Sequence, residues 1–304
     1  MTDSCIGTNG FGLEYTEFAC LYQNSIGRFT TKWEKFYDPQ PVLAFMEDRP
    51  FIPIGTVIAY LIFCFVGKKV MHTKDAWKWR KYLAFWNFFL STFSFIGAFR
   101  TGPQLIHNLT TMSMRDNLCG DPRVLFGSGS SGLWIQLFIL SKFPELMDTF
   151  FIVIHKKPLI FLHWYHHVTV LLYCWHSYVT KSPSGIFFSV MNYSVHAIMY
   201  GYYFLMAIKM KPKWLNAMFI TTAQISQMVV GVSITILASY YYKTNDEAVD
   251  GKCWIQGENN LAAFIMYGSY FFLFAQFFIA RYFRVRTMSV TTSPLRKKKA
   301  KKNE

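Results

Sequence analysis

His163-Trp164-Tyr165-His166-His167 lies inside a segment, 159–179, that is otherwise apolar enough to cross a membrane. In a helix that turns 100° per residue, the three histidines fall within about 100° of arc and face the same way. Three polar rings in hydrocarbon are costly unless they line a cavity and serve a function. A core histidine with a backbone partner explains one such ring but not three. The stretch therefore predicts a membrane helix that carries an active site.

The rest of the chain extends this pattern to a whole membrane domain. Of its 304 residues, 52% are hydrophobic and only 16% are charged, which is too apolar for a soluble domain of this size. A window of about 20 residues predicts seven spans. They are 51–67, 82–107, 132–154, 159–179, 184–208, 213–241 and 260–283. We therefore expect an all-α polytopic protein with a luminal segment 1–50, a membrane domain 51–283 and a basic cytosolic tail 284–304.

The distribution of charge predicts the orientation. The net charge is +14, but the basic residues concentrate on one side of the predicted topology. One set of segments holds 20 Lys/Arg and two acidic residues, namely 68–81, 155–158, 209–213 and 281–304. The N-terminus and the remaining loops hold nine Lys/Arg and 13 acidic residues. The positive-inside rule places the first set in the cytosol, so the N-terminus is luminal and the C-terminus cytosolic. Basic residues at membrane ends set topology and meet lipid headgroups, so nucleic-acid binding is not expected.

Cysteines and the tail indicate the compartment. Four of the six cysteines fall on the predicted luminal side, where disulfides can form, although their pairing cannot be read from the sequence. They are Cys5, Cys20, Cys119 and Cys253. The cytosolic tail ends in lysines at positions 297–299, 301 and 302, which resemble the dilysine signal that returns membrane proteins to the endoplasmic reticulum.

Polar residues recur at helical spacing in three further spans, so each set shares one face of its helix. They are Lys142, Glu145 and Asp148 in the third span, Asn192, His196 and Tyr200 in the fifth, and Gln224 and Gln227 in the sixth. Each set alone has a structural explanation, such as an ion pair or an interhelical hydrogen bond. Together with the histidines they predict one hydrated cavity in the cytosolic half of the bundle. Arg100, nearer the luminal end, is expected to extend toward the interface.

Such a cavity suits a particular kind of substrate. A neutral imidazole can act as a base, a hydrogen-bond donor, a metal ligand or an acyl acceptor. A water-soluble headgroup would reach the histidines from the cytosol, past a rim of basic residues. An apolar tail would then extend between the helices toward the lumen. An amphiphile with a polyphosphate head and a fatty tail has this shape, and an acyl-CoA is an example.

Four motifs resemble the successive signatures of the very-long-chain fatty acid elongases, the ELO family. They are residues 142–150 (KFPELMDTF), 163–167 (HWYHH), 192–203 (NYSVHAIMYGYY) and 222–227 (TAQISQ), which occur in the family's order. The stretch 157–162 most resembles the elongase-6 branch, which acts on saturated and monounsaturated acyl chains. The first 50 residues carry none of the resemblance.

The resemblance implies a fold, a reaction and partners. Six of the seven helices would enclose a narrow acyl tunnel as two inverted three-helix units. The reaction would be the condensation of acyl-CoA with malonyl-CoA to a 3-oxoacyl-CoA two carbons longer, with release of CoA and CO2. No metal or redox cofactor would be needed. The enzyme would reside in the endoplasmic reticulum membrane with the 3-oxoacyl-CoA reductase, the dehydratase and the enoyl-CoA reductase of the cycle, and a homo-oligomer would be compatible with this.

On this hypothesis His166 is the nucleophile, and His196 orients or stabilises the malonyl unit. His163, His167 and Asn192 would hold the imidazole or supply oxyanion donors. The supporting polar belt comprises Lys142, Glu145, Asp148, Tyr200, Gln224 and Gln227. The residues expected to bind CoA are Lys142, His155, Lys156, Lys157, Tyr202, Arg281 and Arg284. Product length should depend on bulk at the luminal end of the tunnel, for example at Phe187 or Phe188.

Three alternatives remain open. Cys174 lies on the face of the histidines, about 10 Å from His167, and is a rival nucleophile. A membrane di-iron desaturase or hydroxylase also carries HxxHH boxes, but it needs about eight histidine ligands, whereas this chain has one box. A transporter or receptor also places polar groups at mid-membrane depth, yet no span carries paired Gly/Pro breaks and the familiar receptor signatures are missing.

Overall fold

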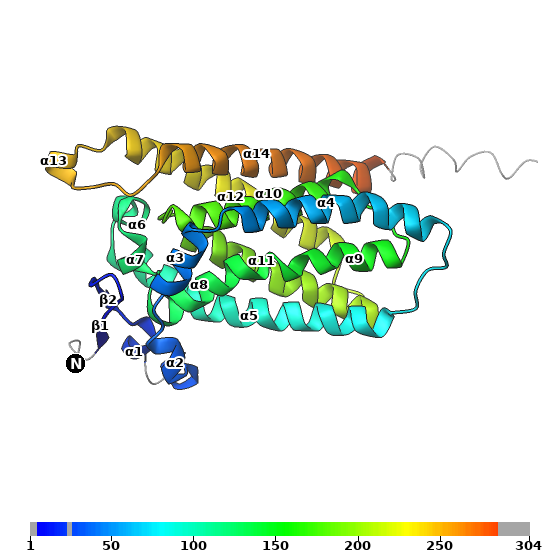
Figure 1. Ribbon diagram of the computed structural model, residues 1–304, viewed down its shortest axis with the longest axis horizontal. Coiled ribbons are helices and arrows are strands. Elements are labelled where there is room, and N and C mark those ends of the chain that lie inside the picture. The colour runs from blue at the N-terminus through cyan, green and yellow to red at the C-terminus, as the bar shows by residue number, and fades with distance from the viewer. Residues whose placement is uncertain (1–4, 23–25, 285–304) are drawn as a thin grey trace, which may run out of the picture.

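The computed structural model describes residues 5–22 and 26–284, which form an almost entirely helical molecule. The long helices run side by side along its longest axis (Figure 1). They are α4 (Phe51–His72), α5 (Arg80–Thr111), α10 (Phe161–Val179), α11 (Gly185–Ala207), α12 (Ala217–Thr244) and α14 (Gly257–Ile279), with the shorter α8 (Gly129–Ser141) and α9 (Met147–Ile154) among them. Helices suit an apolar chain in lipid because they satisfy every backbone polar group internally.

In the described part of the chain, four helices are long and apolar enough to cross a membrane by length and composition. They are α4, α5, α12, and α14 together with the turn that follows it. These correspond to the first, second, sixth and seventh predicted spans. Helices α10 and α11 coincide with the fourth and fifth predicted spans, but they carry the histidines and the other polar residues of the predicted site. The chain is therefore a multi-pass helical membrane protein, and the total of seven spans stays a prediction.

The third predicted span, 132–154, is not one continuous helix. Helix α8 ends at Ser141, a 3-10 turn covers Pro144–Leu146, and α9 begins at Met147. Proline lacks the amide hydrogen that an α-helix requires, and the turn instead uses short-range bonds such as Leu146 N to Phe143 O at 3.2 Å. Because of this interruption, Lys142 and Asp148 do not lie on one regular helical face as their spacing predicted.

The N-terminal segment folds against one end of the bundle, at the left of Figure 1, with the short helices of two loops. Its elements are the antiparallel strands β1 (Ile6–Thr8) and β2 (Glu14–Thr16), α1 (Phe18–Leu21), a 3-10 turn (Ile26–Phe29), α2 (Lys32–Lys35) and α3 (Gln40–Glu47). The loop helices are α6 (Met114–Cys119), α7 (Pro122–Leu125) and α13 (Glu247–Asp250). The chain leaves the bundle at the opposite end, after a π-helical turn (Ala280–Arg284), and the predicted dilysine signal lies outside the described residues.

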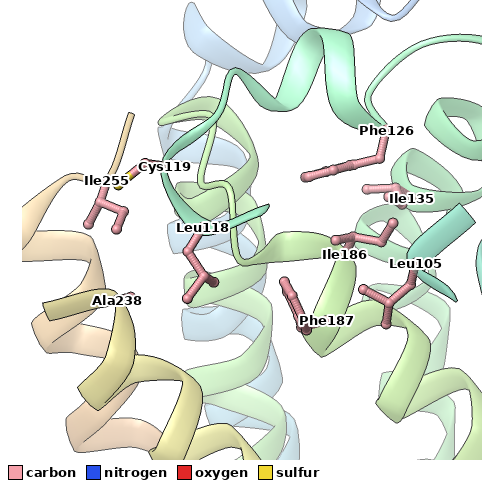
Figure 2. Close-up of a cluster of buried hydrophobic side chains, with 9 residues drawn as sticks. All are labelled: Leu105, Leu118, Cys119, Phe126, Ile135, Ile186, Phe187, Ala238 and Ile255. Carbon is pink, nitrogen blue, oxygen red and sulfur yellow. The ribbon is translucent and has the colours of Figure 1, made fainter. Parts of the chain in front are cut away.

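The four cysteines predicted on the luminal side all pair at this N-terminal end. Cys5 bonds to Cys20 within the segment, and Cys119, the last residue of α6, bonds to Cys253 before α14. Through Cys119 the second disulfide is part of a cluster of buried apolar side chains from five helices and two loops (Figure 2). Leu118, Ile186 and Ala238 in this cluster are almost completely buried. The cluster and the disulfides hold this end of the bundle together.

Arg100 does not extend to the interface as we expected. Its guanidinium is buried and pairs with Glu34 of α2 at 3.1 Å, and it also donates a short hydrogen bond to the carbonyl of Phe29. The Trp134 ring donates to the same carboxylate oxygen of Glu34 at 2.9 Å. Sequence reasoning failed here because the partner lies 66 residues away in the N-terminal segment. Arg100 thus anchors that segment to α5 and α8.

We expect Glu34→Gln to loosen the N-terminal segment by about 1–3 kcal/mol, because Arg100 loses its buried counter-charge while the amide keeps one acceptor oxygen. Burial raises the pKa of Glu34, but hydrogen bonds from Trp134, the Thr31 amide and Arg100 outweigh it and leave the pKa below its usual 4.5. The lowered folded-state pKa stabilises the protein above pH 4.5, and this contribution is lost as pH falls through the folded value. The rate of limited proteolysis within residues 5–50, measured as a function of pH, reports both the effect of Glu34→Gln and the loss of stability at low pH. Equal resistance of Glu34→Gln and of the control Glu14→Gln, whose exposed side chain forms no ion pair among the described residues, would contradict this role.

Candidate active site

A cavity of about 850 Å³ lies inside the bundle and contains the histidines. Six helices supply its described lining residues, namely α5, α9, α10, α11, α12 and α14, whereas α4 contributes none. This agrees with the expectation that six helices enclose the site. The residues of the predicted site on its wall are His155, Lys157, His163, His166, His167, Asn192, His196, Tyr200, Gln224, Gln227 and Asp148.

The histidine box occupies the first two turns of α10, which begins at Phe161 after the extended residue Ile160. The rings of His163 and His167 lie 4.5 Å apart between centroids, and those of His166 and His167 lie 5.5 Å apart. His163 Nε2 forms a 2.8 Å hydrogen bond with Thr149 Oγ1, which in turn bonds to the hydroxyl of Tyr60 at 2.7 Å. This chain of contacts connects the box to α9 and α4 and fixes the orientation of the His163 ring.

His166 and His167 differ in their access to the cavity. The ring of His167 is buried beside His163 and Tyr60, whose ring centroid lies 6.2 Å away. His166 is half-buried and packs against Tyr270 at 5.0 Å between centroids. Within residues 5–22 and 26–284, no protein group forms a hydrogen bond with either ring nitrogen of His166. Its imidazole is therefore free to contact a molecule in the cavity.

Asn192 on α11 joins two polar groups at the end of the cavity nearest the N-terminal segment. Its amide nitrogen lies 3.1 Å from His196 Nε2, and its amide oxygen accepts from Lys142 Nζ at 3.2 Å. Lys142 also pairs with Glu145 at 2.7 Å, and both side chains are almost completely buried. Neither of them is among the residues that line the cavity. Lys142 thus acts through Asn192 on His196 and does not face the open space.

Asp148 is held by two donors on the cavity wall. The Trp86 ring donates to one carboxylate oxygen at 2.7 Å, and the Tyr200 hydroxyl donates to the other at 2.6 Å. The ring of Tyr200 also lies 5.3 Å from that of His196. These contacts tie α5, α9 and α11 together around the site. Gln224 and Gln227 face the same space from α12, where the Gln224 amide lies 3.3 Å from the sulfur of Met199.

The residues predicted to bind CoA divide into two groups. His155 and Lys157 line the mouth of the cavity, where Arg80 joins them. His155 Nδ1 bonds to the carbonyl of Phe151 at 2.7 Å, and its Nε2 has no partner among the described residues. Arg80 donates to the last carbonyls of α11, at 2.6 Å from Ala207 O and 3.1 Å from Met206 O. This mouth is positively charged and lies at the end where the chain leaves the bundle.

The other predicted CoA contacts lie away from the cavity wall. Lys156 donates to the carbonyls of His72 and Lys74, at 3.2 Å and 3.0 Å, so its side chain points to the loop after α4. Tyr202 packs below Lys211, whose Nζ lies 6.0 Å from its ring centroid. Arg281 is exposed on the π-helical turn. The backbone of Arg284 ends that turn, and its side chain lies outside the described part of the structure.

The rival nucleophile Cys174 does not face the histidine cavity. It lines a separate, smaller cavity of about 70 Å³, nearer the N-terminal segment. Phe188 also lines this smaller cavity, whereas Phe187 packs into the apolar cluster of Figure 2. Of the two aromatic residues that we expected to limit product length, only Phe188 therefore lines one of these two cavities.

The described residues contain no group of three His, Cys, Asp or Glu side chains arranged to hold a metal ion. His163 Nε2 bonds to a threonine and His196 Nε2 to an asparagine, so each of these two nitrogens is engaged with a neutral partner. A di-iron desaturase or hydroxylase requires a converging set of histidine ligands. This arrangement does not favour that alternative.

Sequence reasoning missed several residues that support the site. Thr149 and Tyr60 position His163, Trp86 holds Asp148, and Arg80 stands at the mouth. Thr149 directly follows Asp148 in the quoted motif, and a hydroxyl in a membrane segment was a usable signal. Tyr60 and Trp86 gave no such signal, because aromatic residues are abundant in every span.

Comparison with known proteins agrees with this geometry. The sequence model of the GNS1/SUR4 family (ELO) matches residues 45–290. Very long chain fatty acid elongase 6 of Drosophila melanogaster is 43% identical over 223 residues, 73% of this chain and 69% of the relative. The protein of the same name in Gallus gallus is 38% identical over 251 residues, which cover 83% of this chain and 92% of that relative. Fatty acid elongase 3 of Trypanosoma brucei brucei is 35% identical over 303 aligned positions, which cover 91% of this chain and 93% of that relative.

Proposed function

This chain belongs to the GNS1/SUR4 (ELO) family and acts in fatty acid elongation, and from this premise we propose that it is a 3-oxoacyl-CoA synthase. It would condense a long-chain acyl-CoA with malonyl-CoA to a 3-oxoacyl-CoA two carbons longer, with release of CoA and CO2. The substrates would be saturated or monounsaturated acyl chains, given the resemblance of residues 157–162 to the elongase-6 branch. No metal or redox cofactor takes part in the proposed reaction.

One observation carries the proposal. His166 presents an imidazole with unengaged nitrogens to a cavity that has a basic mouth, while His163 and His196 are held by Thr149 and Asn192. A free imidazole flanked by positioned polar groups suits a nucleophile supported by hydrogen-bond donors. The basic mouth suits the phosphates of CoA, which Arg and Lys recognise well. The mostly apolar residues that line the smaller cavity, on the other side of the histidines, suit a fatty chain.

In the first half-reaction, a ring nitrogen of His166 attacks the thioester carbonyl of acyl-CoA. The new carbon–nitrogen bond forms as the carbon–sulfur bond breaks, the other ring nitrogen of His166 gives up its proton, and the departing thiolate of CoA takes up that proton. The product is an acyl-imidazole on His166. His163 and His167 line the same face of α10 and support the developing oxyanion.

In the second half-reaction, malonyl-CoA binds after free CoA departs. Its carboxylate leaves as CO2, and the electron pair of the broken carbon–carbon bond forms a thioester enolate. The enolate carbon attacks the acyl-imidazole and the carbon–nitrogen bond breaks. The departing imidazolide takes up one proton from solvent, which returns His166 to its neutral starting state. His196 and Asn192 stabilise the enolate oxygen, and Lys142 keeps Asn192 in position.

The proposed setting is the endoplasmic reticulum membrane, with the N-terminus in the lumen and the C-terminus in the cytosol. The two disulfides at the N-terminal end support a luminal position, because disulfides persist in oxidising compartments. The basic mouth then opens to the cytosol, where acyl-CoA and malonyl-CoA are supplied. A reductase, a dehydratase and an enoyl-CoA reductase must complete the cycle, since the 3-oxo group has to be removed before another round.

The direct test uses membranes from cells that express this chain and from cells that do not. Palmitoyl-CoA and radiolabelled malonyl-CoA are supplied without NADPH, so that a 3-oxoacyl product accumulates. We expect labelled 3-oxoacyl-CoA and released CO2 only with the expressed chain. If well-expressed protein forms no product from a panel of acyl-CoAs, the proposed function is wrong, and the iron content of the purified protein would then test the di-iron alternative.

We further expect Thr149→Val to slow condensation by about 10- to 100-fold, because His163 loses a buried hydrogen-bond partner worth about 1–3 kcal/mol. The effect should fall on kcat more than on KM, because CoA binding at the mouth is unchanged. Thr222→Val is the matched control, since that exposed hydroxyl bonds only to its own helix at Met218 O. Equal kcat values for the two variants would show that Thr149 has no positioning role.

A further inference from the structure

The smaller cavity lies directly beyond the histidines, on the side of the N-terminal segment. On α11, Asn192 lines the larger cavity, and Phe188 and Ser189 line the smaller one, about one helical turn apart. On α10, His167 faces the larger cavity and Cys174 faces the smaller one, about 10 Å along the axis. The two spaces are therefore successive along the same pair of helices.

The histidines line the end of the larger cavity that faces the smaller one. On α10 the larger cavity is lined only by the first turns, up to His167, and on α11 only from Asn192 onward. All of its space therefore extends from the box toward the basic mouth. If His166 carries the acyl carbon, that space is needed by CoA and malonyl-CoA. The fatty tail must then continue the other way, past Phe188, into the smaller cavity.

The far wall of the smaller cavity comes from the N-terminal segment. Phe11, Pro39 and Leu43 line it, and the side chain of Leu43 is almost completely buried. The match to the family begins only at residue 45, so these three residues lie outside the region that this chain shares with the family model. The end of the internal space is thus built by a part of the chain that lies outside the family model.

The segment is attached rigidly enough to act as a wall. Cys5–Cys20 closes its hairpin, and Glu17 accepts hydrogen bonds from the amide and hydroxyl of Ser130 at 3.0 Å and 2.5 Å. Near the cavity, Lys181 pairs with Glu47 at 2.9 Å. Together with the Arg100–Glu34 pair, these contacts bind the segment to α5, α8 and the loop after α10.

We propose that the N-terminal segment forms the end of the acyl site and limits the length of the chain that this enzyme elongates, with Leu43 as the residue that meets the methyl end. This inference rests on the proposed condensing function and adds a specificity-determining segment to it. Removing bulk at Leu43 extends the apolar space, and adding bulk shortens it. Each added methylene that fits an apolar pocket changes the relative rate by about tenfold or more.

The experiment measures condensation rates for saturated acyl-CoAs of increasing length with wild type, Leu43→Ala and Leu43→Trp. We expect the preference for the next longer substrate to rise about tenfold in Leu43→Ala and to fall about tenfold in Leu43→Trp. Met46→Ala is the matched control, because Met46 is equally buried on α3 but does not line the cavity. It should keep the wild-type profile despite a similar loss of packing.

A second measurement does not depend on turnover or on the folding of variants. An acyl-CoA with a photoreactive diazirine at its methyl end is cross-linked to wild-type protein, and peptides are identified by mass spectrometry. Labelling should fall on the peptide that contains Leu43. If wild type makes product but both Leu43 variants keep its profile, or the label falls elsewhere, the inference is overturned while the condensing function stands. If wild type makes no product at all, the proposed function fails and the inference falls with it.

Discussion

His166→Ala should reduce condensation by on the order of 10⁴-fold or more, the largest effect we expect in this protein, because it removes the proposed nucleophile, a half-buried cavity imidazole whose ring nitrogens have no hydrogen-bond partner among the described residues. The loss should appear in kcat at saturating palmitoyl-CoA. Wild type mixed with acyl-CoA alone should release one equivalent of CoA and carry the acyl group on His166. The mutant should release none. Peptide mass spectrometry checks the site, and added malonyl-CoA should discharge it.

His176→Ala is the matched control for this experiment. The residue lies on the same helix, but its side chain is exposed and outside the cavity, so activity should stay within about twofold of wild type. Cys174→Ser distinguishes the rival nucleophile. Activity that survives in His166→Ala but is lost in Cys174→Ser would reverse the assignment. Because Cys174 lies in the separate, smaller cavity, we expect Cys174→Ser to stay active and His166→Ala to be inactive.

Lys142→Met should lower the free energy of unfolding by about 3–5 kcal/mol, because it leaves the Glu145 carboxylate buried without its counter-charge. Only one oxygen of Glu145 has hydrogen-bond partners among the described residues, Lys142 and Ser141, so the remaining contacts cannot compensate. Asn192 also loses its donor, so His196 should be less well positioned and activity should fall. Thermal unfolding in detergent measures the stability loss.

Two comparisons separate this role from a general loss of charge. In the double variant Lys142→Met with Glu145→Gln, neither member of the buried pair is charged. Much of the lost stability should therefore return, while activity stays low. Lys181→Ala breaks a pair with Glu47 whose side chains are 27% and 40% exposed, and it should cost less than about 1 kcal/mol. Similar losses in Lys142→Met and Lys181→Ala would rule out a special contribution from the buried pair.

The helices and the histidine cavity were predictable because their signals are local. The length of an uninterrupted apolar run identifies a membrane helix. The sequence spacing of the polar residues along α10 and α11 determines which side chains share a helical face. The regular spacing of Lys142 and Asp148 was misleading, because Pro144 interrupts the helix between them. Arg100 was misread for a different reason, since its partner Glu34 is distant in sequence and belongs to a segment without membrane character.

The sequence by itself determined the class of fold, the helices that bear polar groups and the nature of those groups, because helical periodicity acts over a few residues. Only the tertiary structure decided the pairing of the cysteines, the separation of Cys174 from the histidines and the position of the N-terminal segment across the end of the smaller cavity. These depend on how distant elements pack against one another. Packing is a property of three-dimensional shape and complementary charge, which no local pattern in one chain encodes.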